Sequence, residues 1–136
     1  MITEDYVSFE TAKLLKEKGF DEPTVFRYGD YPDNNDLLFA PSGMAIVKNS
    51  ETQPYFYSAP TLQMAMKWLR EVHNIAIETE WEHLWYAYIK PMTSKPSEED
   101  YYQCESSKYE EACEAAIKYC LENLVYYIVP KSFENS

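Results

Sequence analysis

Glycine is scarce in this chain, and its scarcity excludes the motifs that bind phosphate. The 136 residues contain three glycines, at positions 19, 29 and 43, and these do not form a glycine-rich loop. Phosphate-binding loops and dinucleotide-binding turns need closely spaced glycines, because their backbone must approach the phosphate. The G-x-S-x-G elbow of serine hydrolases is also absent. The sequence therefore contains no recognised motif of phosphate or nucleophilic chemistry.

Cysteine and histidine, which are common ligands of transition metals, are also few. The three cysteines, Cys104, Cys113 and Cys120, form no C-x-x-C pair, and an odd number is typical of reduced thiols in a cytoplasm. Cys113 and Cys120 are too far apart along one helix for a disulfide, because their separation corresponds to a rise of about 10.5 Å. We therefore predict no bound metal, no cofactor and no intramolecular disulfide.

The two histidines are the only basis for an enzymatic hypothesis. His73 falls at the expected end of an amphipathic helix, where packing or capping is the simpler role and a catalytic base is the alternative. His83 follows a run of glutamates, which permits a carboxylate–imidazole metal site but is also typical of a solvated hairpin tip. Because no second cluster has ligand spacing, an enzyme that uses His73 or His83 with a glutamate is the least favoured of three hypotheses.

Basic residues are outnumbered by acidic ones, 12 against 23, which gives a net charge of −11. This balance argues against a general nucleic-acid binder, which needs a basic footprint, and against adhesion to anionic membrane surfaces. The first residues, MITEDYVSF, lack the basic and apolar regions of a signal peptide. No apolar run approaches the roughly 18 residues of a membrane span. We expect a cytoplasmic protein that binds neither nucleic acid nor membranes.

The most strongly patterned stretch, residues 55–77, predicts a strand, a helix and a strand in succession. Residues 55–57 are aromatic and strand-prone, and Ser58 is placed to cap the helix. At about 100° per residue, the apolar residues that follow form one stripe, which predicts a helix lying on a core. The stripe comprises Leu62, Ala65, Met66, Leu69 and Val72, with Trp68 on its flank. Asn74 suits the left-handed position that ends a helix.

The remaining pattern predicts two more helices and several short strands. One helix is expected over 9–18 between Ser8 and Gly19, and another from the capping-box pattern at Ser107 to about Leu124. Strands are expected at 25–28, 37–40, 44–47, 55–57, 75–79 and 84–90. Together these predict one α+β domain over 1–136, with an antiparallel or mixed sheet of about five strands and helices mainly on one face. Turn-forming and polar residues predict mobile loops at 29–36 and 91–106.

Acidic residues gather in the last third of the chain. They are Glu98, Glu99, Asp100, Glu105, Glu110, Glu111 and Glu114. The simpler interpretation is a solvated loop and helix face. The functional alternative is an acidic inhibitor that mimics a nucleic-acid backbone and binds a basic host protein.

Tyrosines alternate with other residues in two of the predicted strands. Tyr86 and Tyr88 fall on one side of 84–90, and Tyr55 and Tyr57 fall on one side of 55–57. The simpler interpretation places all four rings in the core with hydroxyls at its rim. The alternative is that they share one open sheet face that binds a protein partner or a second subunit as a homodimer. Strand pairing and register decide between these interpretations.

Three segments resemble small uncharacterised proteins of gut-bacterial genomes and their prophages. They are the runs Tyr6 to Phe20, Ala59 to His73 and Tyr109 to Ala112, and the resemblance spans most of the chain. It carries over no catalytic or binding residue and implies only a bacterial or phage cytoplasmic setting. Our first hypothesis is therefore a non-enzymatic accessory or protein-binding module of a prophage or mobile element.

Overall fold

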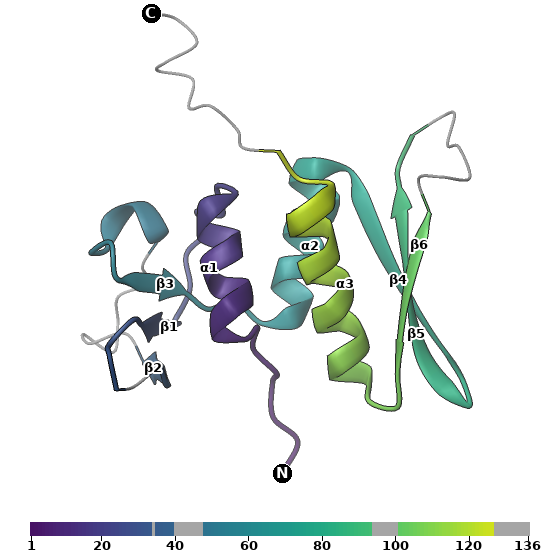
Figure 1. Ribbon diagram of the computed structural model, residues 1–136, viewed down its shortest axis with the longest axis horizontal. Coiled ribbons are helices and arrows are strands. Elements are labelled where there is room, and N and C mark those ends of the chain that lie inside the picture. Colours follow the sequence, from purple (N-terminus) through teal and green to yellow (C-terminus); the bar gives the residue numbers. More distant parts are fainter. Residues whose placement is uncertain (34, 40–47, 94–100, 127–136) are drawn as a thin grey trace, which may run out of the picture.

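The computed structural model describes residues 1–33, 35–39, 48–93 and 101–126, and it confirms a single α+β domain. Within these ranges, a layer of three α-helices lies between two three-stranded antiparallel sheets (Figure 1). The strands that we predicted as one sheet are thus divided between two. The sequence pattern identifies strands but does not specify their partners, and here pairing stays local on each side of the second helix.

The first sheet is small and has the order β2-β1-β3. Its strands are β1 (Phe26–Gly29), β2 (Leu37–Phe39) and β3 (Phe56–Ser58), and all neighbours are antiparallel. The predicted loop at 29–36 begins at the last residue of β1. The predicted strand at 44–47 lies outside the described residues.

The second sheet is longer and has the order β4-β5-β6. Its strands are β4 (Ile75–Glu82), β5 (Leu84–Pro91) and β6 (Tyr102–Ser106). The predicted hairpin forms, but its turn is tighter than the four residues expected, because His83 adopts a left-handed conformation with φ of 68°. The loop predicted over 91–106 is wrong for 102–106, which form β6, and residues 94–100 lie outside the described residues.

The first helix, α1 (Phe9–Glu17), has the two ends that the sequence predicts. The Ser8 hydroxyl accepts a hydrogen bond of 3.2 Å from the Thr11 amide, which caps the N-terminus. At the other end Gly19 has φ of 92°, and the Phe20 amide donates to the Leu15 carbonyl at 2.8 Å. This is the Schellman ending, which needs a residue that tolerates positive φ.

The second helix, α2 (Leu62–His73), has its N-cap three residues later than the predicted cap. Thr61 is the N-cap, since its hydroxyl accepts from the Met64 amide at 3.1 Å, whereas Ser58 belongs to β3. The predicted stripe is buried at Leu62, Ala65, Met66 and Leu69, with Trp68 also buried, but Val72 is 45% exposed. Asn74 ends the helix with φ of 56°, as expected.

The third helix, α3 (Tyr109–Asn123), forms where the sequence predicts a helix, but the predicted cap is wrong. Ser107 caps nothing; the Ser106 hydroxyl instead accepts from the Lys108 amide and donates to the Glu111 carboxylate at 2.7 Å. The buried side chains are small or apolar: Ala112, Cys113, Ala116, Ile117, Cys120 and Leu121. Small residues at these positions let the helix approach the sheet closely.

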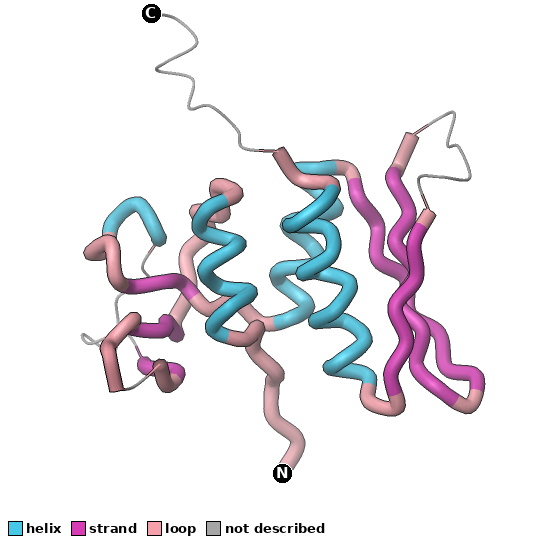
Figure 2. Tube along the Cα trace, viewed as in Figure 1, coloured by secondary structure: helices cyan, strands magenta, loops and turns pink. Residues whose placement is uncertain are grey.

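The helical layer gives each sheet one covered face. Helix α1 packs against β3 and α3, while α3 also packs against β5 and β6. Figure 2 shows the helices between the strands of the two sheets. One continuous core therefore runs through the helices, with Leu15, Leu69 and Ile89 all fully buried in it. The opposite face of the β4-β5-β6 sheet points away from this core.

Candidate protein-binding face

The four tyrosines proposed as one binding face do not lie on one face. Tyr57 is in β3 and Tyr55 directly precedes it, whereas Tyr86 and Tyr88 are in β5. β3 and β5 belong to different sheets, which lie on opposite sides of the helices (Figure 1). The expectation of a shared face is therefore wrong, because it required pairing between strands that the helical layer separates.

The tyrosine of β3 points toward the helices. The Tyr57 ring is half-buried and meets the Phe9 ring edge-on at 5.8 Å. The Lys16 ammonium lies over the same ring, 5.0 Å from its centre, which is within the range of a cation–π contact. Tyr55 is 45% exposed and packs on Phe56 instead. These two rings have separate surroundings and form no common binding surface.

Lys16 links helix α1 to the first sheet. Its ammonium donates to the backbone carbonyls of Pro54 at 3.2 Å and Phe56 at 2.9 Å. These bonds join the C-terminal part of α1 to the segment that leads into β3. Burial lowers the pKa of Lys16, because desolvation disfavours its charged form. The residue has a structural role.

The tyrosines of β5 lie on the opposite side of their strand from the core. Ala87 and Ile89 are fully buried against the helical layer, so Tyr86 and Tyr88 lie on the outer face, as the alternation predicts. Their rings stack with centres 6.1 Å apart and planes 14° from parallel. Both rings are partly exposed. They form a flat aromatic centre on a sheet face that no described helix covers.

Carboxylates border this aromatic centre on both sides. Directly opposed residues of antiparallel strands share a sheet face. On β4, Glu80 opposes Tyr86 and Glu78 opposes Tyr88; on β6, Glu105 opposes Tyr86. We call the surface formed by these residues and their neighbours on the same side the outer tyrosine face. Its members are Glu78, Glu80, Glu82, Tyr86, Tyr88, Lys90, Gln103 and Glu105.

The outer tyrosine face carries net negative charge. Four of its side chains are carboxylates and one is an ammonium, that of Lys90, which bonds Glu78 at 2.6 Å. This hydrogen bond and the Glu78 charge raise the pKa of Lys90. Desolvation, together with the nearby Glu80 charge, raises the pKa of Tyr88. At neutral pH the face is therefore an acidic surface with an uncharged aromatic centre.

The sequence contained a usable signal for the parts of this face that we missed. Glu78, Glu80 and Glu82 recur at every second position, which is the spacing of one side of a strand. Their position next to His83 in the sequence instead suggests a metal site. Gln103 and Glu105 fall within the loop predicted over 91–106, whereas in the structure they belong to β6. Its polar composition hid the same two-residue alternation.

The two histidines are placed apart from any assembled site. His73 packs edge-on against Trp68 with ring centres 4.6 Å apart, and burial lowers its pKa. Its Nε2 atom is buried without a hydrogen-bond partner among the described residues. His83 is exposed at the hairpin turn. In the part of the chain that the structure describes, no three His, Cys, Asp or Glu side chains form a group that could hold a metal ion.

The cysteines are free thiols in apolar surroundings. Cys113 and Cys120 are buried, and Cys104 is half-buried. Burial raises the pKa of Cys120 to about 12 and also raises the pKa of Cys104 and Cys113. Because the thiolate is the reactive form, these shifts disfavour nucleophilic roles at neutral pH. The cysteines act as small core residues.

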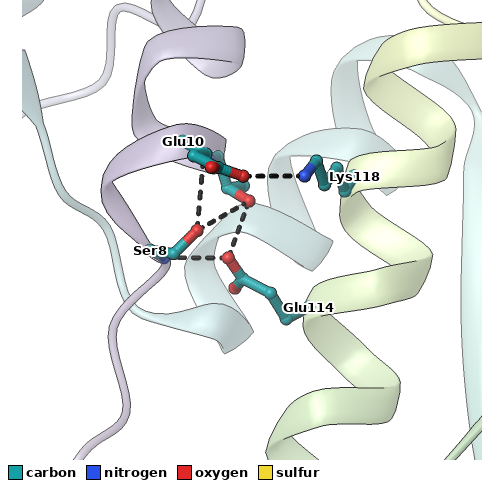
Figure 3. A network of polar contacts seen from close by, with 5 residues as sticks. Ser8, Glu10, Glu114 and Lys118 are labelled. Carbon is teal, nitrogen blue, oxygen red and sulfur yellow. Dashed lines mark hydrogen bonds and ion pairs between the residues drawn. The ribbon is translucent and has the colours of Figure 1, made fainter.

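The acidic segment of the last third is divided by the fold. Glu105 lies on the outer tyrosine face, whereas Glu114 turns toward α1, as Figure 3 shows. The Glu114 carboxylate accepts from the Ser8 amide at 2.9 Å and from the Thr11 hydroxyl at 2.6 Å. Next to it, Lys118 pairs with Glu10 at 2.9 Å. Glu114 thus joins α3 to α1, and Glu98, Glu99 and Asp100 lie outside the described residues.

No helix among the described residues is both long and apolar enough to cross a membrane. Comparisons with protein-family models, with curated proteins and with solved structures yield no match.

Proposed function

We propose that this chain is a non-enzymatic protein-binding module and that its outer tyrosine face binds a basic surface of another protein. The observation that carries the proposal is the face of the β4-β5-β6 sheet that no described helix covers, where two stacked tyrosines lie between a row of carboxylates on β4 and Glu105 on β6. Tyrosine is enriched in protein interfaces, because it contributes contact area at low entropic cost and keeps a hydroxyl for hydrogen bonding.

The charge of the face supports a basic partner over a second copy of the chain. In a symmetric dimer through this face, the carboxylates of both copies would meet, and opposed like charges are destabilising. Lysine or arginine side chains of a partner would instead pair with Glu80, Glu82 or Glu105. The acidic surroundings would also speed the encounter with a basic protein. This argument favours a hetero-complex over a homodimer, which are the two alternatives that the sequence leaves open.

A second candidate is an acidic inhibitor that mimics nucleic acid. It is favoured by the regular spacing of Glu78, Glu80 and Glu82, which form a row of negative charges along β4. In this case the partner would use the same basic surface to bind DNA or RNA. Under either candidate, a bacterial or phage setting remains a prediction from the resemblance of the three segments described above.

Affinity capture with matched variants tests the proposal. The face variant is Glu80→Gln with Glu105→Gln, and the control is Glu71→Gln with Glu122→Gln, which removes the same charge from exposed helical positions. We expect the wild type and the control to retain a basic protein from the native lysate and the face variant to lose it. Equal retention by all three proteins would overturn the proposed site. Competition by duplex DNA for the retained protein would favour the inhibitor.

A further inference from the structure

Strand β4 forms one edge of its sheet along its whole length. All eight of its residues pair with β5, from Ile75 opposite Pro91 to Glu82 opposite Leu84. Within the described ranges, no strand pairs with its other side. An edge strand presents backbone N–H and C=O groups to any extended segment that approaches it. Addition of a partner's strand to such an edge is a recurring mode of peptide recognition.

The second half of β4 is accessible from both sides of the sheet. Glu78, Glu80 and Glu82 are exposed on the outer side. Thr79 and Trp81 are exposed on the side that faces the helices, where Trp81 retains 61% of its surface. The helices thus leave Trp81 largely uncovered, whereas the Tyr109 hydroxyl of α3 interacts with Thr79. Among the residues that the structure describes, no strand occupies the free side of residues 79–82.

The carboxylate row of β4 specifies which strand would fit. Glu78, Glu80 and Glu82 recur at every second residue, so they lie about 6.6–6.8 Å apart along the outer side. A strand paired in register presents its own alternate side chains at the same interval, with Cβ atoms about 4.5–5.5 Å from those of β4. Lysine or arginine at those alternate positions would oppose a carboxylate each time.

The same row argues against self-pairing through this edge. If β4 of a second copy added to β4, glutamates would oppose glutamates, and like charges directly across two strands are destabilising. The acidic row thus disfavours pairing of this edge with β4 of a second copy, while the edge stays available to basic strands.

Resting on the function proposed above, we infer that the partner supplies a β-strand with lysine or arginine at alternate positions, and that this strand adds to the free edge of β4. Its basic side chains lie on the outer side opposite Glu78, Glu80 and Glu82. The residues between them lie on the other side, where the exposed ring of Trp81 favours an apolar partner.

Binding of synthetic peptides to the whole protein tests this inference by calorimetry and by Trp81 fluorescence. The probe is a capped peptide of about eight residues in which lysine and valine alternate. One control has the same composition with its lysines in a single block, and another replaces lysine by glutamate. We expect the alternating lysine peptide to bind at least tenfold more tightly than both controls. The fluorescence change should disappear in Trp81→Phe, which leaves Trp68 and Trp85 in place.

Methylation of the peptide backbone separates strand addition from binding on the sheet face. Two peptides carry N-methyl groups on alternate residues. In one peptide the methyl groups block the N–H groups of one strand edge, and in the other peptide they block those of the opposite edge. Strand addition uses one peptide edge, so one methylated peptide should lose binding and the other should retain it. Equal binding of both would show that the backbone is not used and would overturn the inference. A Glu80→Lys, Glu82→Lys variant should reverse the preference toward the glutamate peptide.

The outcomes also distinguish this inference from the proposed function. If the captured basic protein depends on Glu80 and Glu105 but the alternating peptide neither binds nor displaces it, strand addition is wrong and the face proposal stands. If the alternating peptide binds while the captured protein does not depend on the face, the edge binds strands but the proposed function falls.

Discussion

The two sheets of this molecule each carry a pair of tyrosines on one face, but the two pairs have opposite surroundings. In the first sheet, Tyr28 and Tyr57 face α1, and the Tyr28 hydroxyl donates to the Val7 carbonyl at 2.6 Å. In the second sheet, Tyr86 and Tyr88 face away from the helices and stack on each other. Alternation determines which residues share a side of a strand, but the position of the helical layer determines which side is buried.

The largest expected effect on stability separates the buried side of β5 from its outer side. Ile89 is fully buried in the core, so Ile89→Ala should lower the free energy of unfolding by about 2–5 kcal/mol through lost burial and a cavity. The adjacent Tyr88→Ala should shift the urea midpoint far less. Midpoints that change equally would show that the two sides of β5 do not differ in burial.

The next effect concerns the contacts by which Lys16 joins α1 to the first sheet. Lys16→Met should lower the free energy of unfolding by about 1.5–3 kcal/mol, because hydrogen bonds from its ammonium to the Pro54 and Phe56 carbonyls are lost. Lys13→Met is the matched control, since the Lys13 ammonium lies over the rings of Phe9 and Tyr57. Urea unfolding of both variants measures the difference. If Lys13→Met lowers the free energy of unfolding as much as Lys16→Met does, the effect comes from the lost charge or cation–π contact and not from the hydrogen bonds.

A smaller effect compares the hydroxyls of the two sheets. Tyr28→Phe should cost about 1 kcal/mol, because the Val7 carbonyl loses its donor, whereas Tyr86→Phe should leave the urea midpoint unchanged. Burial raises the pKa of Tyr28 above its ordinary value of 10.0. The unfolded chain therefore loses this proton first, and the contribution is present below pH 10.0 and is lost as the pH rises further. Above pH 10.0, the free energy of unfolding of Tyr28→Phe should therefore fall less steeply with pH than that of the wild type.

The helices could be predicted because their signals are local. The caps at Ser8 and Gly19, the αL residue Asn74 and the buried stripe of α3 each depend on neighbours within a few residues. The predicted cap of α2 at Ser58 is wrong, because two capping residues lie close together and Thr61 is the one that accepts from the Met64 amide.

The sheets and the site were harder to predict, because they depend on pairing between distant segments. Nothing local distinguishes Tyr57, which faces α1, from Tyr86, which faces away from α3. β6 alternates polar and half-buried residues, and its charge favoured a loop assignment. The alternation of Tyr86 and Tyr88 against Ala87 and Ile89 was predicted correctly, because it follows from strand geometry alone.

The smallest expected effect on stability is also the most informative one for function. In Tyr86→Ser with Tyr88→Ser, both changes lie on the outer tyrosine face, so the variant should fold and unfold much like the wild type. Tyr126→Ser provides a surface control, because Tyr126 is 80% exposed. Light scattering should report a monomer for wild type and variant, since the carboxylates of the face disfavour a second copy. The variant should, however, lose the basic partner, because the aromatic centre of the contact is removed. A wild-type dimer that becomes a folded monomer would instead place a self-association interface here, and loss of folding would place these rings in the core.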